Sequence, residues 1–366
     1  MPRPPVFIFH RPAQPGEPAL VRLLADVRGR LIEHQSALFE RAGDPVVQQF
    51  HRSAGATFGE VLAAAAPARG GLIVLSSGAV PRLRAADVDR LMAVATSDGR
   101  RALTNNRYSS DICAIGDAGV LGNLPPLPTD NALPRWLEER AGYDVAELRG
   151  RERLALDLDT PLDIALVGLA PDTPKWLREE AASAGLAVPR LAELRALAAD
   201  PHRELIVFGR SGAATLRWLE RNVRCRVRFL AEERGLRAAS PLAIGGARRP
   251  TAGRLPRATL GRLLATRGLA ALADVVTELG DGAIIDSRVL LADRLGADES
   301  AWPPPADRFA SDLHRPMEVR DEWLRALTRA AAHSPQPILL GAHSLVGPGV
   351  PLLLRRVRRG APFHCQ

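Results

Sequence analysis

Short apolar runs alternate with segments of helical periodicity through most of this chain. Strand-like runs at Val6 to Phe9, Gly71 to Ser76 and Glu204 to Phe208 each precede a helical pattern. Repeated switching between the two patterns is typical of an α/β protein with largely parallel strands. We therefore expect an α/β fold.

The join between two predicted domains falls near residue 200. A length of 366 residues favours two domains over one. Ala199 to His202 interrupts the helical pattern before the alternation starts again at Glu204. The sequence thus predicts domains over residues 1–200 and 201–366, the second being an arginine-rich α/β domain.

Several local patterns predict individual elements. A helical pattern over 20–38 contains Gly29, which can break it, and the apolar alternation over 154–158 predicts a strand. Residues 116–131 and 307–315 lack such patterns and predict loops.

Arginine supplies nearly all of the positive charge. Of 49 basic residues only Lys175 is a lysine, which excludes a Schiff-base or phosphate-loop lysine elsewhere. Between Gly209 and Gly268 there are 14 arginines and three acids, whereas the rest of the chain has 35 basic and 38 acidic residues. Such a concentration suits an anion-binding surface.

The cysteines and the hydropathy indicate where the protein works. Cys113, Cys225 and Cys365 are too few and too scattered for a disulfide framework or a Cys-rich zinc site. No run approaches the roughly 20 apolar residues of a membrane helix, and the first nine residues lack a signal-peptide pattern. We expect a cytoplasmic protein without a membrane partner.

The most informative motif is D-L-D-T-P-L-D, from Asp157 to Asp163. Asp157 and Asp159 are the candidate catalytic and metal-binding residues, because carboxylates suit Mg²⁺ that bridges phosphates. Asp163, in the first turn of the next helix, is a third carboxylate. In the alternative interpretation, Asp159 and Thr160 only cap that helix and Asp163 interacts with its N-terminus.

This motif resembles the late D-x-D-T-P-x-D signature of nucleotidyltransferases of the molybdenum-cofactor and 2-phospholactate guanylyltransferase type. The resemblance covers roughly residues 6–168. It implies a nucleotide-diphospho-sugar transferase-like fold with a Rossmann-like mixed sheet in the N-terminal half. It also implies a phosphate-binding first loop with Arg11 and Arg22 facing phosphates, and bound Mg²⁺. The loop Phe9 to Gly16 is more similar to that of relatives described as glycosyltransferase-like.

Two elements depart from the family pattern. Ser76, Ser77 and Gly78 occupy the place of a metal-binding aspartate after a strand, and serine is a poor ligand for a hard cation. Residues 19–23 read A-L-V-R-L where the relatives have K-T-R-L, so the lysine is missing. Either the domain binds a nucleotide without turnover, or its site is rearranged.

A polar run from Asn105 to Asp111 separates two apolar runs. Asn105 and Asn106 can hydrogen-bond a base or sugar, Arg107 can neutralise a phosphate, and Asp111 adds a charge. The alternative is an ordinary turn, in which Asn and Ser are common.

The C-terminal half offers further anion-binding candidates. Gly209, Arg210 and Ser211 lie at a strand-to-helix turn, where backbone amides can bind a phosphate or carboxylate. Arg226 and Arg228 share one face of a strand, either for an anionic ligand or as a solvated, ion-paired edge. His343 follows a buried-type strand and is a candidate for a second site.

We expect nucleotidyl transfer from an NTP to a small phosphorylated or carboxylated acceptor. The rival is a catalytically inactive nucleotide- or anion-binding regulatory protein with the same fold. A nucleic-acid partner is a weaker alternative, because aromatic residues make up only 4% of the chain and no reading motif is present.

Overall fold

The computed structural model describes residues 4–43, 47–51, 56–233 and 256–355 and divides them into two compact units. Of these residues, the first unit holds those up to Ile164 together with 171–185. The second unit holds 165–170, 186–233 and 256–355, so the chain passes between the units more than once.

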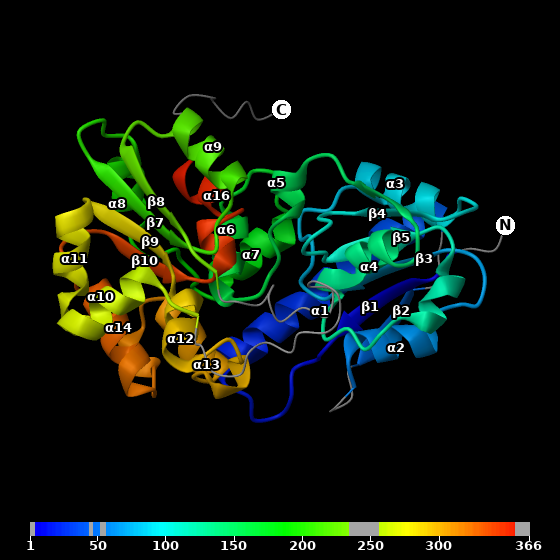
Figure 1. Cartoon of the computed structure of the whole chain (residues 1–366), viewed down its shortest axis with the longest axis horizontal. Helices are drawn as coiled ribbons and strands as arrows, with labels where there is room; N and C mark the ends of the chain where they lie inside the picture. The colour runs from blue at the N-terminus through cyan, green and yellow to red at the C-terminus, as the bar shows by residue number, and fades with distance from the viewer. Residues whose placement is uncertain (1–3, 44–46, 52–55, 234–255, 356–366) are drawn as a thin grey trace. The chain divides into compact units, whose positions relative to one another are not determined.

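The first unit is built on a mixed six-stranded sheet (Figure 1). Its strands are β1 (Val6–His10), β2 (Val47–His51), β3 (Leu72–Ser76), β4 (Arg101–Thr104), β5 (Ile112–Ile115) and β6 (Asp144–Glu147), in the order β2-β1-β3-β5-β4-β6. β5 runs antiparallel to β3 and β4, and the other neighbours are parallel. The start of β5 therefore lies at the edge where the other strands end.

Helices cover both faces of this sheet. The helices of this unit are α1 (Ala19–Gly43), α2 (Phe58–Ala65), α3 (Ala85–Ala95), α4 (Leu133–Glu139), α5 (Arg151–Leu154) and α7 (Lys175–Ser183), and α6 (Pro161–Gly168) begins in this unit. Phe7 and Val74 pack with α2 and α4, whereas Ile8 and Leu75 pack with α1 and α3. Burial on both faces explains why these strands are continuously apolar.

The second unit has a parallel four-stranded sheet in the order β10-β9-β7-β8. Its strands are β7 (Glu204–Gly209), β8 (Arg226–Ala231), β9 (Gly282–Asp286) and β10 (Ile338–Gly341). Its helices are α8 (Leu191–Ala198), α9 (Ala213–Asn222), α10 (Thr259–Arg267), α11 (Leu272–Leu279), α12 (Ser287–Leu295), α13 (Pro305–Asp312), α14 (Glu322–Ala332), α15 (His343–Val346) and α16 (Val350–Leu354). The α/β class predicted from the sequence is confirmed.

Some local predictions are wrong. The strand predicted over 154–158 is absent: α5 ends at Leu154, and the next six residues are irregular. Leu154, Leu156 and Leu158 are buried as the alternation requires, but no strand of the described chain pairs with them. Gly29 does not break α1, and most of the loop predicted over 307–315 belongs to α13.

The elements that were not predicted include β2, β6 and α12. β2 and β6 are edge strands with polar or charged residues in short sequences, so they lack a strong apolar signal. α12 contains the buried polar residues Arg288 and Asp293, which obscure its apolar periodicity.

A buried ion pair joins α12 to α13 in the second unit. Two nitrogens of Arg288 donate to the carboxylate of Asp312 at 2.5 and 2.7 Å, and both side chains are almost fully buried. Burial raises the pKa of Asp312, and Arg288 opposes that shift. Loss of Arg288 would remove the ion-paired counter-charge of this carboxyl group and leave only the smaller electrostatic effect of Arg308.

Arg288→Ala is expected to destabilise the second unit by about 3–5 kcal/mol, because removing one partner of a buried pair strands the other. Hydrogen exchange of a peptide covering β9 measures the effect within that unit. Arg320→Ala is the matched control, because Arg320 is exposed. Equal exchange in the two variants would show that the pair does not stabilise the fold.

Candidate functional site

The ends of β1 and β3 and the start of β5 meet at one edge of the first unit's sheet. The Ser77 N–H donates to the Phe9 carbonyl at 2.8 Å, and the Ser76 N–H donates to the Asp111 carbonyl at 3.2 Å. The reversal of β5 thus brings Asp111 beside the residues that replace the expected metal aspartate.

Asn105 holds Asp111 in place. Its side-chain amide donates to the Asp111 carboxylate at 2.7 Å and to the Leu154 carbonyl at 2.9 Å. Its oxygen accepts the Asp111 backbone N–H at 3.0 Å. Because Asn105 is fully buried and uses both ends of its amide internally, it positions Asp111 rather than reading a base or sugar.

A second carboxylate, Asp130, reaches the same edge from a short 3₁₀ helix at Asp130–Ala132. Its side chain accepts a hydrogen bond from the Ser76 hydroxyl. Nearby, the Ser109 hydroxyl donates to the Asn131 side-chain oxygen at 2.7 Å. The serine that replaces the expected aspartate therefore binds an aspartate that arrives from elsewhere in the chain.

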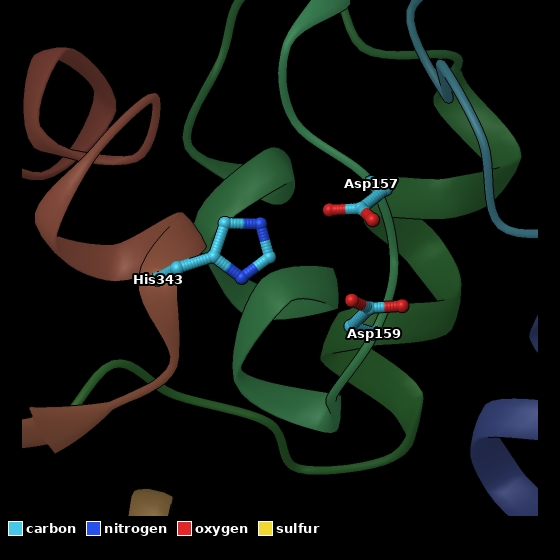
Figure 2. A group of neighbouring side chains, drawn as sticks. All are labelled: Asp157, Asp159 and His343. Carbon is cyan, nitrogen blue, oxygen red and sulfur yellow. The ribbon is translucent and has the colours of Figure 1, made fainter. Parts of the chain in front are cut away.

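Asp157 and Asp159 lie on the irregular segment that leads into α6, and Figure 2 shows their carboxylates next to each other. The segment is anchored by the buried side chains of Leu156 and Leu158 and by the Leu158 N–H, which donates to the Gly78 carbonyl at 2.9 Å. One carboxylate oxygen of Asp157 lies within 4.8 Å of one carboxylate oxygen of Asp159.

The two carboxylates differ in their partners. Arg28 on α1 donates to Asp159 at 2.9 Å and to the Leu158 carbonyl at 2.7 Å. Oδ1 of Asp157 is buried and has no hydrogen-bond partner in the described part of the chain. Asp157 therefore carries an unsatisfied acceptor inside a negatively charged site.

Asp163 is not a third ligand of this site. Its carboxylate accepts the Thr160 N–H at 2.7 Å, and the Thr160 hydroxyl accepts the Asp163 N–H at 3.3 Å. This reciprocal arrangement is a capping box. It agrees with the alternative interpretation for these two residues, in which Thr160 caps the helix and Asp163 interacts with its N-terminus. That interpretation does not account for Asp159, which is paired with Arg28.

The acidic cluster, defined as Asp111, Asp130, Asp157 and Asp159, is electrostatically strained. Burial, followed by repulsion from Asp130, raises the pKa of Asp111 to about 8. Burial also raises the pKa of Asp130 to about 6, and Asp159 contributes by repulsion. The pKa of Asp157 lies well above its ordinary value, first through burial and then through Asp159 and Asp111.

These residues fit a divalent cation. The donors are carboxylate oxygens, which suit a hard ion such as Mg²⁺. A cation would supply a partner for the unsatisfied Asp157 oxygen and relieve the repulsion within the cluster. Asp157 and Asp159 are the adjacent pair that would hold it, with Asp111 and Asp130 close enough to add negative charge.

Other predicted binding residues of this unit have different surroundings. Arg11 is exposed and pairs with Glu17 at 2.5 Å, and Arg22 is exposed on α1. Arg107 donates to the Val145 carbonyl at 2.6 Å and pairs with Glu138 at 3.1 Å, which directs it to β6 and α4. The Asn106 oxygen accepts the Tyr108 N–H at 3.1 Å, as in a turn.

The strand-to-helix turn in the second unit binds internal groups. Gly209 has a φ of +127°, and a Cβ there would lie 2.3 Å from that of Asp286. The Arg210 N–H faces the Asp286 carboxylate at 3.4 Å, and the Ser211 hydroxyl donates to the Val346 carbonyl at 2.5 Å. A carboxylate of the chain itself thus occupies this turn.

The remaining predicted residues also lie in the second unit. Arg226 and Arg228 are exposed on the edge strand β8 and face Glu204 at 3.8 and 3.0 Å, and Arg228 also donates to the Leu279 carbonyl at 2.9 Å. This is the ion-paired edge considered as the alternative. His343, also drawn in Figure 2, begins α15 directly after β10.

Sequence reasoning missed Asp130 and Arg28. Asp130 lies in a segment without periodicity, and Arg28 is one of many arginines on a helix. Only the fold brings Asp130 to Ser76 and Arg28 to Asp159.

No protein-family model matches the chain, and no curated protein matches its sequence. Among the residues that the structure describes, none of the helices has the length and apolar character needed to cross a membrane.

The raised pKa values predict how stability depends on pH. An acid with a folded pKa of about 8 retains a proton that the unfolded chain releases near 3.8, so stability falls as pH rises through that range. We expect the melting temperature to fall between about pH 5.5 and 8.5 without divalent cations, and Mg²⁺ to reverse part of the fall, because cation binding is favoured as the carboxyls ionise.

Differential scanning calorimetry with and without Mg²⁺, at matched ionic strength, measures this. Asp157→Asn should remove most of the Mg²⁺ effect. An equal effect of Mg²⁺ at low and high pH would contradict a site formed by these carboxyls.

Proposed function

We propose that the first unit is a metal-dependent nucleotidyltransferase with a nucleotide-diphospho-sugar transferase-like fold. It would transfer a nucleotidyl group from an NTP to a small phosphorylated or carboxylated acceptor. The observation that carries the proposal is the unsatisfied, buried oxygen of Asp157 beside Asp159 at an edge where strands end. Ligands of α/β proteins commonly bind at such edges.

The rearranged acidic cluster supports activity despite the departures from the family pattern. Ser76 stands where the resemblance implies a metal aspartate, but Asp130 accepts its hydroxyl hydrogen bond, and Asp111 lies beside its backbone. The Asp130 carboxylate thus reaches this position from another segment, whereas Asp111 contacts Ser76 through its backbone carbonyl. Asp130 supplies in space a carboxylate that the sequence lacks at residues 76–78.

The cation ligands and the residues that position the cluster have distinct roles in the proposal. Asp157 and Asp159 would hold Mg²⁺, which when bound neutralises the charge that develops on phosphoryl oxygens during transfer. Arg28 fixes one oxygen of Asp159 and so orients the other. The Asn105 side chain fixes Asp111 by one hydrogen bond to its carboxylate and one from its backbone N–H. A third hydrogen bond, to the Leu154 carbonyl, holds the Asn105 side chain in place.

A second candidate is a nucleotide-binding protein without turnover. It is favoured by the absence of a lysine from residues 10–23 and by Arg11, whose guanidinium pairs with Glu17. Both proposals require nucleotide binding, and they differ in whether the acidic cluster is needed for a reaction.

Isothermal titration with NTPs in the presence and absence of Mg²⁺ tests the proposal. We expect Mg²⁺-dependent binding that Asp157→Asn weakens by about tenfold or more, because a ligand to the cation is lost. Asp26→Asn is the matched control, because Asp26 is an exposed carboxylate on α1.

Pyrophosphate release from the bound NTP with a panel of sugar and polyol phosphates then measures transfer. Release that requires Asp157 supports the enzyme. Binding that is independent of Mg²⁺ and survives Asp157→Asn, without pyrophosphate release, would favour the inactive binder, and no NTP binding would contradict both.

A further inference from the structure

A cleft in the first unit is flanked by two arginines that the proposed function does not use. It has a volume of about 380 Å³ and is lined by Arg90 of α3, Leu103 of β4, Glu147 of β6, Leu148 and Arg149. This volume is within the range of small-molecule sites. Leu103 and Leu148 form the apolar part of the lining. Both are buried members of the hydrophobic cluster that packs against α1 and α3.

We propose that Arg90 and Arg149 bind the phosphate group of the acceptor. This inference rests on the proposed function, and it specifies a phosphorylated rather than a carboxylated acceptor. Two guanidinium groups at one cleft suit the doubly charged phosphate, whose several oxygens can accept from both.

The charge balance around the cleft distinguishes these two arginines from their neighbours. Both are exposed, and within the described ranges neither forms an ion pair. Some other arginines of the same unit are paired: Arg153 pairs with Asp87 at 2.7 Å, and Arg107 pairs with Glu138. Arg90 and Arg149 thus bring two positive charges to a cleft whose lining also contains Glu147.

The cleft lies next to the acidic cluster along the sheet edge. The N–H of Leu148, a residue of the cleft, donates to the Thr104 carbonyl at 2.8 Å. Asn105, which follows Thr104 in the chain, holds Asp111 in the acidic cluster. The Glu147 carboxylate accepts the Arg107 N–H at 2.9 Å. The loop from Asn105 to Asp111 thus connects the cleft with the acidic cluster.

The strand order separates the acceptor from the NTP. β5 lies between β3 and β4, so the cleft at β4 and β6 is on one side of Asp111, and the ends of β1 and β3 are on the other. An acceptor held by its phosphate in the cleft could extend toward the cluster, where the NTP would bind. Glu147 adds a carboxylate that can accept a hydroxyl hydrogen bond from a polyol or sugar part of the acceptor.

Titration with inorganic phosphate and glycerol 3-phosphate, at constant ionic strength set with chloride, tests the inference. We expect saturable binding by the wild type, weakened about tenfold by Arg90→Ala and by Arg149→Ala, because each loses charge-assisted hydrogen bonds. Arg149→Lys should retain part of the affinity, because lysine keeps the charge but not the planar donor set. Arg140→Ala, an exposed arginine near the start of β6, is the matched control.

Binding of Mg²⁺ with NTP to the same variants separates this inference from the proposed function. Unchanged NTP affinity in both alanine variants, with lost phosphate binding, supports a separate acceptor subsite. The inference is overturned if the wild type does not bind phosphate, if both alanine variants bind it normally, or if they lose NTP instead. Phosphate binding without NTP binding would overturn the proposed function and leave an anion site in the cleft.

Discussion

Repulsion among carboxylates at one sheet edge is the constraint on which the first unit's chemistry depends. Burial raises the pKa of Asp111, of Asp130 and of Asp157. Repulsion from a neighbouring carboxylate of the cluster raises each pKa further. Such an arrangement is costly unless the carboxyls are protonated or a cation is bound. Arg28 pairs with Asp159, and Oδ1 of Asp157 is left without a hydrogen-bond donor in the described chain.

The reversal of one strand creates this arrangement. Because β5 is antiparallel to its neighbours, the residue before it lies at the edge where β3 ends. Asn105 and Ser76 then fix Asp111 and Asp130 by hydrogen bonds, so the two carboxylates are positioned by the sheet and not by a flexible loop alone. The loop from Asn105 to Asp111 also contacts Glu147, which lines the cleft of Arg90 and Arg149. This loop therefore connects the acidic cluster with the proposed acceptor subsite.

Local sequence patterns were sufficient where local physics determines the structure. The α/β class follows from the apolar alternation, and α6 begins directly after Thr160, which was predicted to cap it. The alternation at Leu154, Leu156 and Leu158 correctly identified buried positions, but a strand also needs a partner, and pairing is a property of the whole fold.

The site was predictable only in part for the same reason. Asp157 and Asp159 were identifiable from their motif, and Asp111 from its polar run. Asp130 was not, because its contact with Ser76 joins residues that are 54 positions apart. Conversely, Asn105 has a ligand-binding residue type but is buried and uses its amide within the chain, which only the packing reveals.

The most direct test of the central claim is a crystal structure with Mn²⁺, located by its anomalous scattering. We expect a peak at Asp157 and Asp159, with Asp111 and Asp130 nearby, and loss of that peak in Asp157→Asn crystals. A peak only at another place would contradict a cation-binding role for the acidic cluster. So would the absence of a peak at a Mn²⁺ concentration that saturates the binding measured by titration in solution.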